Sequence, residues 1–262
     1  MIVSNKASQL WQKKPESVIS QLTHILDRSP KAIIFFRADD VGIPSKKQDR
    51  LLRTFVAHGV PLCPAIVPAW LNKERWDQIC TVIDNQHQFF CWHQHGWNHF
   101  NHQQSGKKQE FGPDLDRAKK NLAISRGREK LAGILGTNFR PFFTPPWNRV
   151  DAETMEILEV QGFHAISRYR GDKLAAPPTL PDLPANVDLH TRKEPSPDEG
   201  WQALLTELAQ ALTTGCAGIM IHHQRMNDAA FSFLALLLTE IRKRSHFRLV
   251  HFQDLLAKQA TN

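Results

Sequence analysis

Apolar and polar positions follow two patterns along the chain. Short runs of β-branched and aromatic residues, such as AIIFF at 32–36, are typical of buried strands. Longer mixed segments, such as 5–28, have apolar residues at helical spacing and end at a proline or glycine. The strands that we expect are 32–36, 60–68, 88–95, 139–147 (a strand and then a turn), 163–169, 186–190, 216–223 and 247–252. The helices that we expect are 5–28, 47–59, 72–86, 114–136, 151–162, 201–215, 229–244 and 253–259.

Strands and helices alternate from one end of the chain to the other. This alternation predicts parallel βαβ units, because parallel strands need a crossover connection that is usually a helix. With no shift in composition and no internal repeat, the sequence favours an α/β fold class, a distorted (β/α) barrel of roughly seven to eight parallel strands. We expect a single domain over residues 1–262, in which 1–30 contain an N-terminal helix. In such a barrel, functional groups lie at the carboxyl ends of the strands.

Composition and charge narrow the function classes. The 262 residues are 41% hydrophobic, which is enough for a substantial core. The net charge is +7, but the lysines and arginines are scattered and form no stripe with aromatic residues, so we expect no nucleic-acid partner. No apolar run is long enough for a transmembrane helix, and no apolar segment follows a basic start, so we expect neither a membrane partner nor secretion. Four cysteines without a CxxC pair indicate free thiols in a reducing compartment, and we predict a cytoplasmic protein.

Carboxylates and imidazoles gather where the predicted strands end. A metal-dependent hydrolase needs such a set, because nitrogen and oxygen ligands from several strands must converge on one divalent ion. The joint placement of these groups is more informative than any one of them. The strand-end residues are Arg37, Asp39, Asp40, His93, His95, His99, Thr144, Trp147, Asn148, Arg168, Arg170, His222 and His223.

Each of these features also has an ordinary explanation. An Asp-Asp pair can cap a turn or helix. The HxxxH spacing of His95 and His99 brings two imidazoles to one face only if the segment is helical, and many such pairs are simply exposed. Because side chains alternate along a strand, only one of His222 and His223 is expected to face a site.

Four segments in order carry a resemblance to a known family. FFRADDVG, HQHGWNH, RPFFTPPWN and GIMIHH resemble the successive motifs of the NodB-type polysaccharide deacetylases, carbohydrate esterase family four. The resemblance extends from about residue 31 to residue 252, and it suggests a divergent, intracellular member. The fold of that family, a distorted (β/α) barrel, agrees with the alternation of strands and helices.

The resemblance implies a metal centre and two catalytic groups. Asp40, His95 and His99 would ligate a divalent transition metal, with zinc the first expectation and cobalt or nickel as alternatives. Asp39 would act as the general base on the metal-bound water. His222 would act as the general acid that protonates the leaving amine.

Two further positions are implied less directly. A backbone N–H near Trp147 would help to hold the oxyanion. Thr144 occupies the place of the family's motif arginine, so the arginine that orients the base is Arg140, Arg149 or Arg37. Of these, Arg140 is the one that we assign to the site, together with Trp147. Arg168, in the segment where the acidic-aromatic motif is missing, is a further candidate for a base partner.

The sequence thus predicts a hydrolase of carbohydrate metabolism. The expected reaction removes an acetyl or other acyl group from a small or oligomeric N-acetylated sugar or a related amide. One alternative is hydrolysis of a different C–N bond in a small amide, which the missing arginine favours. Another alternative is a deacetylase-like binding protein without turnover. The residues leave the oligomeric state open.

Overall fold

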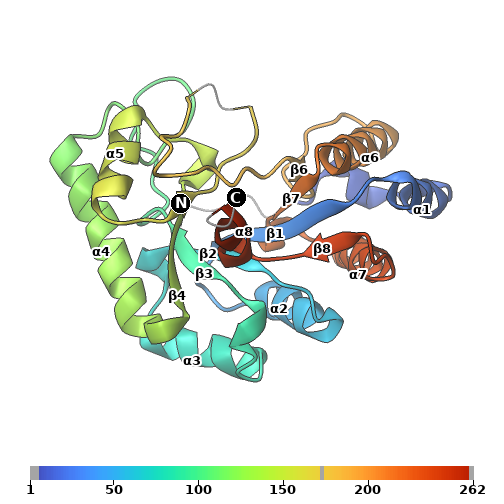
Figure 1. Ribbon diagram of the computed structural model, residues 1–262, viewed down its shortest axis with the longest axis horizontal. Coiled ribbons are helices and arrows are strands. Elements are labelled where there is room, and N and C mark those ends of the chain that lie inside the picture. The colour runs from blue at the N-terminus through green and yellow to red at the C-terminus, as the bar shows by residue number, and fades with distance from the viewer. Residues whose placement is uncertain (1–5, 172–173, 260–262) are drawn as a thin grey trace. The chain divides into compact units, whose positions relative to one another are not determined.

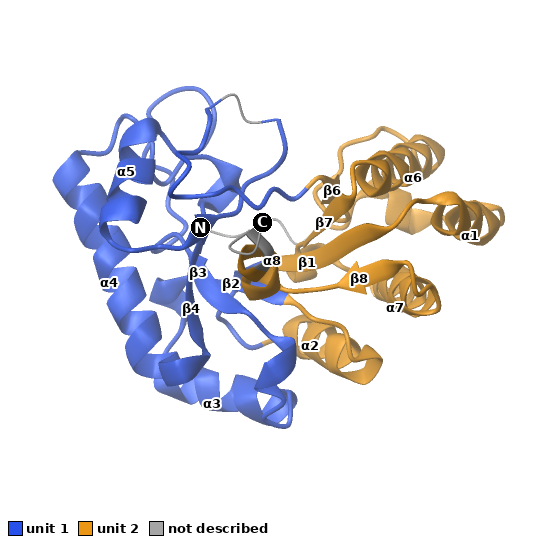
Figure 2. Ribbon diagram, in the orientation of Figure 1, with its two compact units in different colours: residues 1, 39–44, 63–185 blue, residues 2–38, 45–62, 186–262 orange. Residues whose placement is uncertain are grey.

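The computed structural model describes residues 6–171 and 174–259. The chain forms two compact units, each assembled from separate stretches of sequence (Figure 2). Unit 1 contains Asp39–Pro44 and Cys63–Ala185, and unit 2 contains the residues up to Ala38, Ser45–Leu62 and the residues from Asn186 onwards. A single domain over the whole chain stays a prediction.

Unit 1 is built on parallel strands. In spatial order these strands are β5 (Ala165–Ile166), β4 (Phe139–Thr144), β3 (Trp92–His95) and β2 (Cys63–Ile66). The last residues of β1 (Ala32–Val41) also belong to this unit, and the Val67 N–H donates to the Val41 carbonyl at 2.9 Å. Because these strands are parallel, their carboxyl ends share one edge of the sheet.

Helices α3 (Lys73–Val82), α4 (Arg117–Leu135) and α5 (Ala152–Val160) flank the strands of unit 1 (Figure 1). Each helix begins where a side-chain oxygen accepts a backbone N–H of its first turn, and the caps are Asn72, Asp116 and Asp151. Short 3-10 turns connect the elements: η2 (Pro68–Trp70), η3 (His87–Phe89), η4 (Gly136–Asn138) and η5 (Pro146–Asn148).

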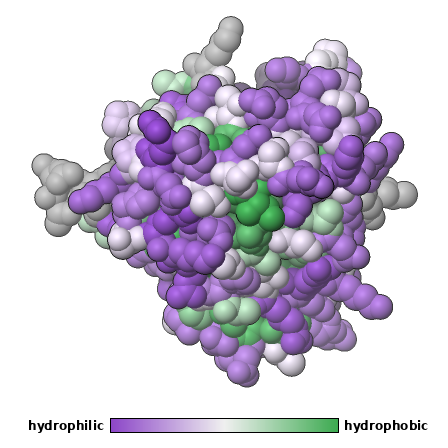
Figure 3. Space-filling view, turned by 90° about the vertical axis from the view of Figure 1, so that its right-hand side faces the viewer, coloured by the Kyte–Doolittle hydropathy of each residue, from purple (hydrophilic) through white to green (hydrophobic). Residues whose placement is uncertain are grey.

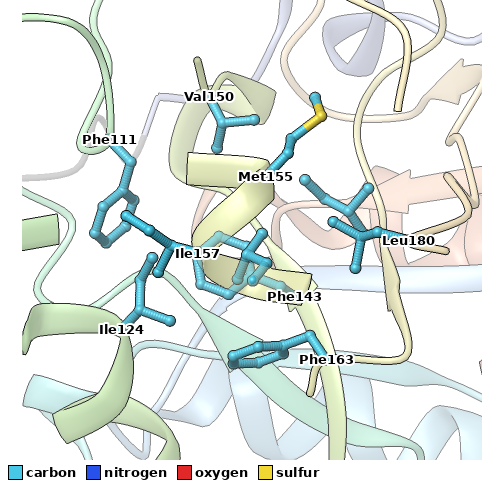
Figure 4. Packing of buried hydrophobic residues seen from close by; sticks show 10 residues of the cluster. Phe111, Ile124, Phe143, Val150, Met155, Ile157, Phe163 and Leu180 are labelled. Atoms are coloured by element: carbon cyan, nitrogen blue, oxygen red, sulfur yellow. The ribbon is translucent and has the colours of Figure 1, made fainter. Parts of the chain in front are cut away.

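The core of unit 1 lies between α4, α5 and β4, where aromatic and aliphatic side chains interdigitate (Figure 4). The Phe143 ring packs edge-on against the rings of Phe111 and Phe163. Buried area of this kind is the main source of folding free energy. The buried members of this cluster are Phe111, Ile124, Phe143, Val150, Met155, Ile157, Leu158, Phe163, Ile166 and Leu180.

Unit 2 is built around the first part of β1. This part of β1 pairs in parallel with both β7 (Cys216–Ile221) and β8 (Phe247–Leu249), and β7 pairs with β6 (Val187–Asp188). Its core includes the rings of Trp11, Trp201 and Phe233 in mutual contact. Its helical elements are η1 (Gln9–Gln12), α1 (Val18–Arg28), α2 (Lys46–His58), α6 (Pro197–Thr213), η6 (His223–Arg225), α7 (Asp228–Arg242) and α8 (Phe252–Gln259).

In the part of the chain that the structure describes, eight parallel strands that alternate with helices confirm the predicted fold class, the distorted (β/α) barrel. The boundaries differ at several places. The predicted helix 5–28 is divided into η1 and α1, with Pro15 between them, and residue 5 lies outside the described residues. Helix α6 begins four residues before the predicted 201, because Ser196 caps it and Pro197 fits its first position. Strand β1 continues to Val41, so the Asp-Asp pair lies within the strand and not after it.

Hydrophilic residues cover most of the face drawn in Figure 3, and hydrophobic residues appear there in small patches. Among the helices of the described residues, none has the length and hydropathy needed to cross a membrane.

Candidate metal centre

The first ligand candidate, Asp40, lies near the end of β1 in unit 1. Its backbone has a φ of 61°, a left-handed conformation that is uncommon for a residue other than glycine. Such a conformation costs free energy, and it recurs at sites where a side chain must point in a particular direction. Asp40 and its neighbour Asp39 are both buried, with 4% and 1% of their surface exposed. Two adjacent buried carboxylates require compensating charge or hydrogen bonds.

The two imidazole candidates come from the segment that ends β3. His95 is the last residue of β3, and His99 follows after a tight turn. The turn is not helical, because Gly96 and His99 have φ values of 59° and 57°. The helical condition for HxxxH is therefore not met, but the structure still brings the two rings together. Their centroids are 5.4 Å apart.

Asp40, His95 and His99 form a group with the geometry of a metal site. The Asp40 Oδ1 lies 3.3 Å from the His95 Nε2 and 3.2 Å from the His99 Nε2. Ligand atoms bound to zinc at about 2.0 Å in a tetrahedral arrangement are about 3.3 Å apart, which matches both distances. All three ligand atoms lie within 4.8 Å of one another, and this is the group among the described residues that could hold an ion.

The hydrogen bonds around His95 leave the correct nitrogen available. Its Nδ1 lies 2.9 Å from the Thr144 carbonyl oxygen. Because a carbonyl can only accept, Nδ1 carries a proton, so Nε2, which lies toward Asp40, is the nitrogen that can bind a metal ion. A metal-bound histidine typically makes such a bond through its other nitrogen, which fixes the ring and its tautomer. The residues present thus fit a divalent transition metal.

The electrostatics of the site favour positive charge. Burial lowers the pKa of the His95 imidazole, but the hydrogen bond to Asp40 and the negative charges of Asp39 and Asp40 outweigh burial, so the pKa is raised above 6.5. The carboxylates of Asp39 and Asp40 thus favour positive charge at this group, which a divalent ion can supply.

Two indole rings flank His99. The ring of Trp147 lies 4.4 Å from the His99 ring, and the ring of Trp70 lies 5.9 Å from it, measured between centroids. Trp147 has a left-handed φ of 55°, which interrupts η5 and turns this residue away from a regular helical path. The structure thus places Trp147 beside the metal-ligand group, as predicted, and adds Trp70, which the sequence analysis did not single out.

Thr144 replaces the motif arginine with a small buried hydroxyl. The Thr144 Oγ1 lies 2.8 Å from the Nε2 of His93, and the Nδ1 of His93 lies 3.0 Å from the Cys91 carbonyl. His93 is fully buried, and it is not a member of the group above.

The assignment of Arg140 to the site was wrong. Arg140 lies at the amino end of β4, and its guanidinium donates to the carbonyls of Thr137 and Phe139. Thr144 stands at the other end of the same strand, beside the metal-ligand group. The residue is thus separated from the group by the length of β4, because a strand rises about 3.3 Å per residue.

The other candidate arginines have structural partners. Arg149 donates to the Lys108 carbonyl at 3.2 Å. The buried Arg168 forms an ion pair with Asp182 at 2.8 Å and also donates to the Leu174 carbonyl. The ion pair of Arg168 and Asp182 links the end of β5 to the loop that follows it in unit 1.

His222 and Arg37 belong to unit 2. The His222 N–H donates to the Nδ1 of His190 at 3.3 Å, directly after β7. The Arg37 guanidinium lies 3.0 Å from the sulfur of Met220. The catalytic role of His222 stays a prediction, as does that of Asp39.

The sequence analysis did not identify one buried acidic residue of unit 1. Glu110 is 1% exposed, and its carboxylate accepts backbone N–H groups of the turn between His95 and His99. Burial raises the pKa of Glu110 to about 7, although these N–H groups and His95 act in the opposite direction. No spacing rule could find this residue, because its partners are main-chain amides and not side chains.

Comparisons with known proteins bear on the fold. No family model matches the chain, and no curated protein matches its sequence. Among solved structures, one from Mycobacterium smegmatis described as a polysaccharide deacetylase is 15% identical, with a TM-score of 0.64 over 89% of this chain and 92% of that chain. A family 4 acetyl xylan esterase from Clostridium thermocellum, in complex with a cobalt ion, is 12% identical, with a TM-score of 0.58 over 87% and 92%.

A third structure, the peptidoglycan deacetylase PdaC from Bacillus subtilis, is 10% identical, with a TM-score of 0.54 over 89% of this chain and 93% of that chain. Sequence identities of 10–15% support a shared fold and do not establish a shared activity. The motif resemblance is confirmed at that level: the chain has the fold of the polysaccharide deacetylases and family 4 carbohydrate esterases.

Proposed function

We propose that this protein is a metal-dependent hydrolase that removes an acyl group, acetyl first of all, from the nitrogen of an N-acylated sugar or a related amide. The observation that carries the proposal is the group of Asp40, His95 and His99, in which the Asp40 Oδ1 lies 3.3 and 3.2 Å from the two histidine nitrogens and all three ligand atoms lie within 4.8 Å of one another. One carboxylate and two imidazoles leave coordination positions open, which a catalytic site requires and a structural site does not.

A bound divalent ion supplies Lewis-acid polarisation of the acyl oxygen and makes water a better nucleophile. Asp39 takes the proton of the attacking water, and His222 gives a proton to the leaving nitrogen. Both roles rest on the motif resemblance. A backbone N–H near Trp147 donates to the oxygen that becomes negative as the carbonyl carbon turns tetrahedral. Zinc, cobalt and nickel all suit this donor set, and a cobalt ion is present in one of the similar structures.

A carbohydrate substrate is supported by two observations. Trp147 and Trp70 are half-buried beside His99, and an indole face that reaches solvent can stack on the apolar face of a sugar ring. The similar structures include an acetyl xylan esterase and a peptidoglycan deacetylase.

The direct test is acetate release from N-acetylated mono- and oligosaccharides by protein loaded with zinc or cobalt. Asp40→Ala is expected to lose both metal and activity. Asp39→Asn and His222→Ala are expected to keep the metal and to lose about 10²- to 10⁴-fold in rate, the usual contribution of a general base or acid. Asp77→Asn is the control, because Asp77 is exposed and pairs only with Lys73 on the same helix. Full metal occupancy in Asp40→Ala would contradict the ligand assignment.

A second candidate is hydrolysis of a different C–N bond in a small amide. It is favoured by Thr144, which puts a neutral hydroxyl bonded to His93 where the family motif has an arginine. Small linear and cyclic amides assayed beside the acetylated sugars separate the two candidates. Turnover of the small amides alone would select the second. Metal binding without turnover of either class would favour a non-catalytic binding protein.

A further inference from the structure

The carboxylate of Glu110 lies against the turn that joins the two imidazole ligands. Its Oε1 accepts the backbone N–H groups of Trp97 at 3.2 Å and Asn98 at 2.8 Å. Its Oε2 accepts the N–H of His99 at 3.3 Å. Three consecutive amides thus converge on one buried carboxylate, an arrangement in which successive N–H groups form a concave site for an anion.

The turn is closed so tightly over Glu110 that Gly96 cannot carry a side chain. A Cβ at this position would overlap the Glu110 Oε2 and would lie 2.6 and 2.7 Å from ring carbons of Pro146. The left-handed φ of Gly96 brings the following amides around to the carboxylate. On the other side, the Gln94 side-chain amide donates to the Gly96 carbonyl at 2.9 Å and to the Ile124 carbonyl of α4 at 3.1 Å.

We propose that Glu110 is a positioning residue that sets the geometry of the two imidazole ligands, an inference that rests on the proposed metal site. His95 is held by β3 and by the Thr144 carbonyl. His99 lies after the end of β3, and its backbone N–H donates to Glu110, so Glu110 helps to set where the His99 side chain begins. Glu110 therefore determines whether both Nε2 atoms reach the same point beside Asp40.

Glu110 acts through the backbone and does not ligate the ion. Both of its oxygens already accept N–H groups, and among the described residues it is not a member of the group that could hold a metal. Groups that orient metal ligands typically contribute 10- to 100-fold in metal affinity. A residue that only stabilised the fold would change the free energy of unfolding and leave the affinity of the folded protein unaltered.

The test uses the full chain and Co²⁺ as the probe. Its dissociation constant is measured by competition with a chelator, and its visible d–d absorption reports the coordination geometry. The variants are Glu110→Gln, which keeps the shape but replaces one acceptor oxygen by a donor, and Glu110→Asp, which keeps the charge but withdraws the carboxylate by about 1.5 Å. Glu129→Gln is the matched control, because Glu129 is exposed on α4 and its carboxylate accepts a hydrogen bond from the Ser125 hydroxyl.

We expect the dissociation constant of Glu110→Gln to rise about 10- to 100-fold with a changed absorption spectrum. Glu110→Asp should recover part of this loss, and Glu129→Gln should match the wild type. Equal affinity and spectrum in the wild type and Glu110→Gln would overturn the inference while leaving the metal site intact. If Glu110→Gln does not fold, the same comparison with Glu110→Asp decides. A wild-type protein that binds no Co²⁺ would overturn the proposed metal site, and the positioning role with it.

Discussion

Replacement of Gly96 by alanine tests the closed turn between the two imidazole ligands. The added methyl group would meet the Glu110 carboxylate and the Pro146 ring, and both residues are buried. Glu110 is the partner that can move, but its movement breaks at least one of its hydrogen bonds to the amides of Trp97, Asn98 and His99. The substitution therefore disturbs the turn without removing a ligand.

The expected cost has two parts. A φ of 59° is left-handed, and a residue with a Cβ pays about 1–2 kcal/mol there. Loss of one hydrogen bond to the charged carboxylate adds about 1.5–3 kcal/mol, so the total is about 2.5–5 kcal/mol. A domain stability of about 5–15 kcal/mol can absorb this loss, so the variant should fold and its metal affinity can be measured.

The assay is urea unfolding together with Co²⁺ titration. Gly106→Ala is the control: its φ of 76° carries the same backbone cost, but no atom lies within 4 Å of the added Cβ. We expect Gly106→Ala to lose about 1–2 kcal/mol and no metal affinity. Gly96→Ala should lose more stability and about 10- to 100-fold in affinity. Equal effects of the two substitutions would refute the reasoning, because the clash with Glu110 would then have no consequence.

Three further predictions concern other parts of the chain. Lys120→Met should lower the free energy of unfolding by about 3 kcal/mol at pH 7, because it leaves Asp151 without its buried partner at 2.5 Å. Burial raises the pKa of Asp151, but hydrogen bonds from Lys120 and Thr154 and the charge of Lys120 outweigh burial and lower it from 3.8. The stability difference should therefore shrink as the pH falls below about 4, and a constant difference would contradict the pairing. Arg140→Ala should leave metal affinity and kcat/KM within about twofold of the wild type, since its guanidinium binds carbonyls at the start of β4, and a tenfold loss would restore it to the site. Trp147→Ala should weaken Co²⁺ binding several-fold by removing the ring that contacts His99, and an unchanged dissociation constant would show that this contact does not hold the ligand.

The fold could be predicted from the sequence because buried strands alternate with amphipathic helices, and prolines, glycines and capping residues mark where these elements end. Helices α4 and α5 begin at Asp116 and Asp151, residues whose side chains cap them as their type predicts. The end of β1 was harder to place. A strand that continues through two charged residues contradicts the usual pattern, and only the packing of the folded chain buries Asp39 and Asp40.

The candidate ligand residues could be predicted for a different reason. Asp40, His95 and His99 are side chains with metal-binding chemistry at the ends of predicted strands, and their order matched a known family. The geometry that brings them together could not be predicted, because the residue types around His99 do not indicate its left-handed backbone conformation. Glu110 was missed because its partners are main-chain amides, which no spacing of residue types reveals. Arg140 was misplaced because the strand direction, and not the motif, decides which end faces the site.

The most direct test of the central claim is the metal content of the purified protein, measured by elemental analysis beside His95→Ala. His95 provides one Nε2 to the group and lies on a strand, so its removal deletes a ligand while the sheet remains. The account predicts about one transition metal per wild-type chain and a large loss in His95→Ala. Absence of metal from the wild type, even after reconstitution with zinc or cobalt, would contradict it.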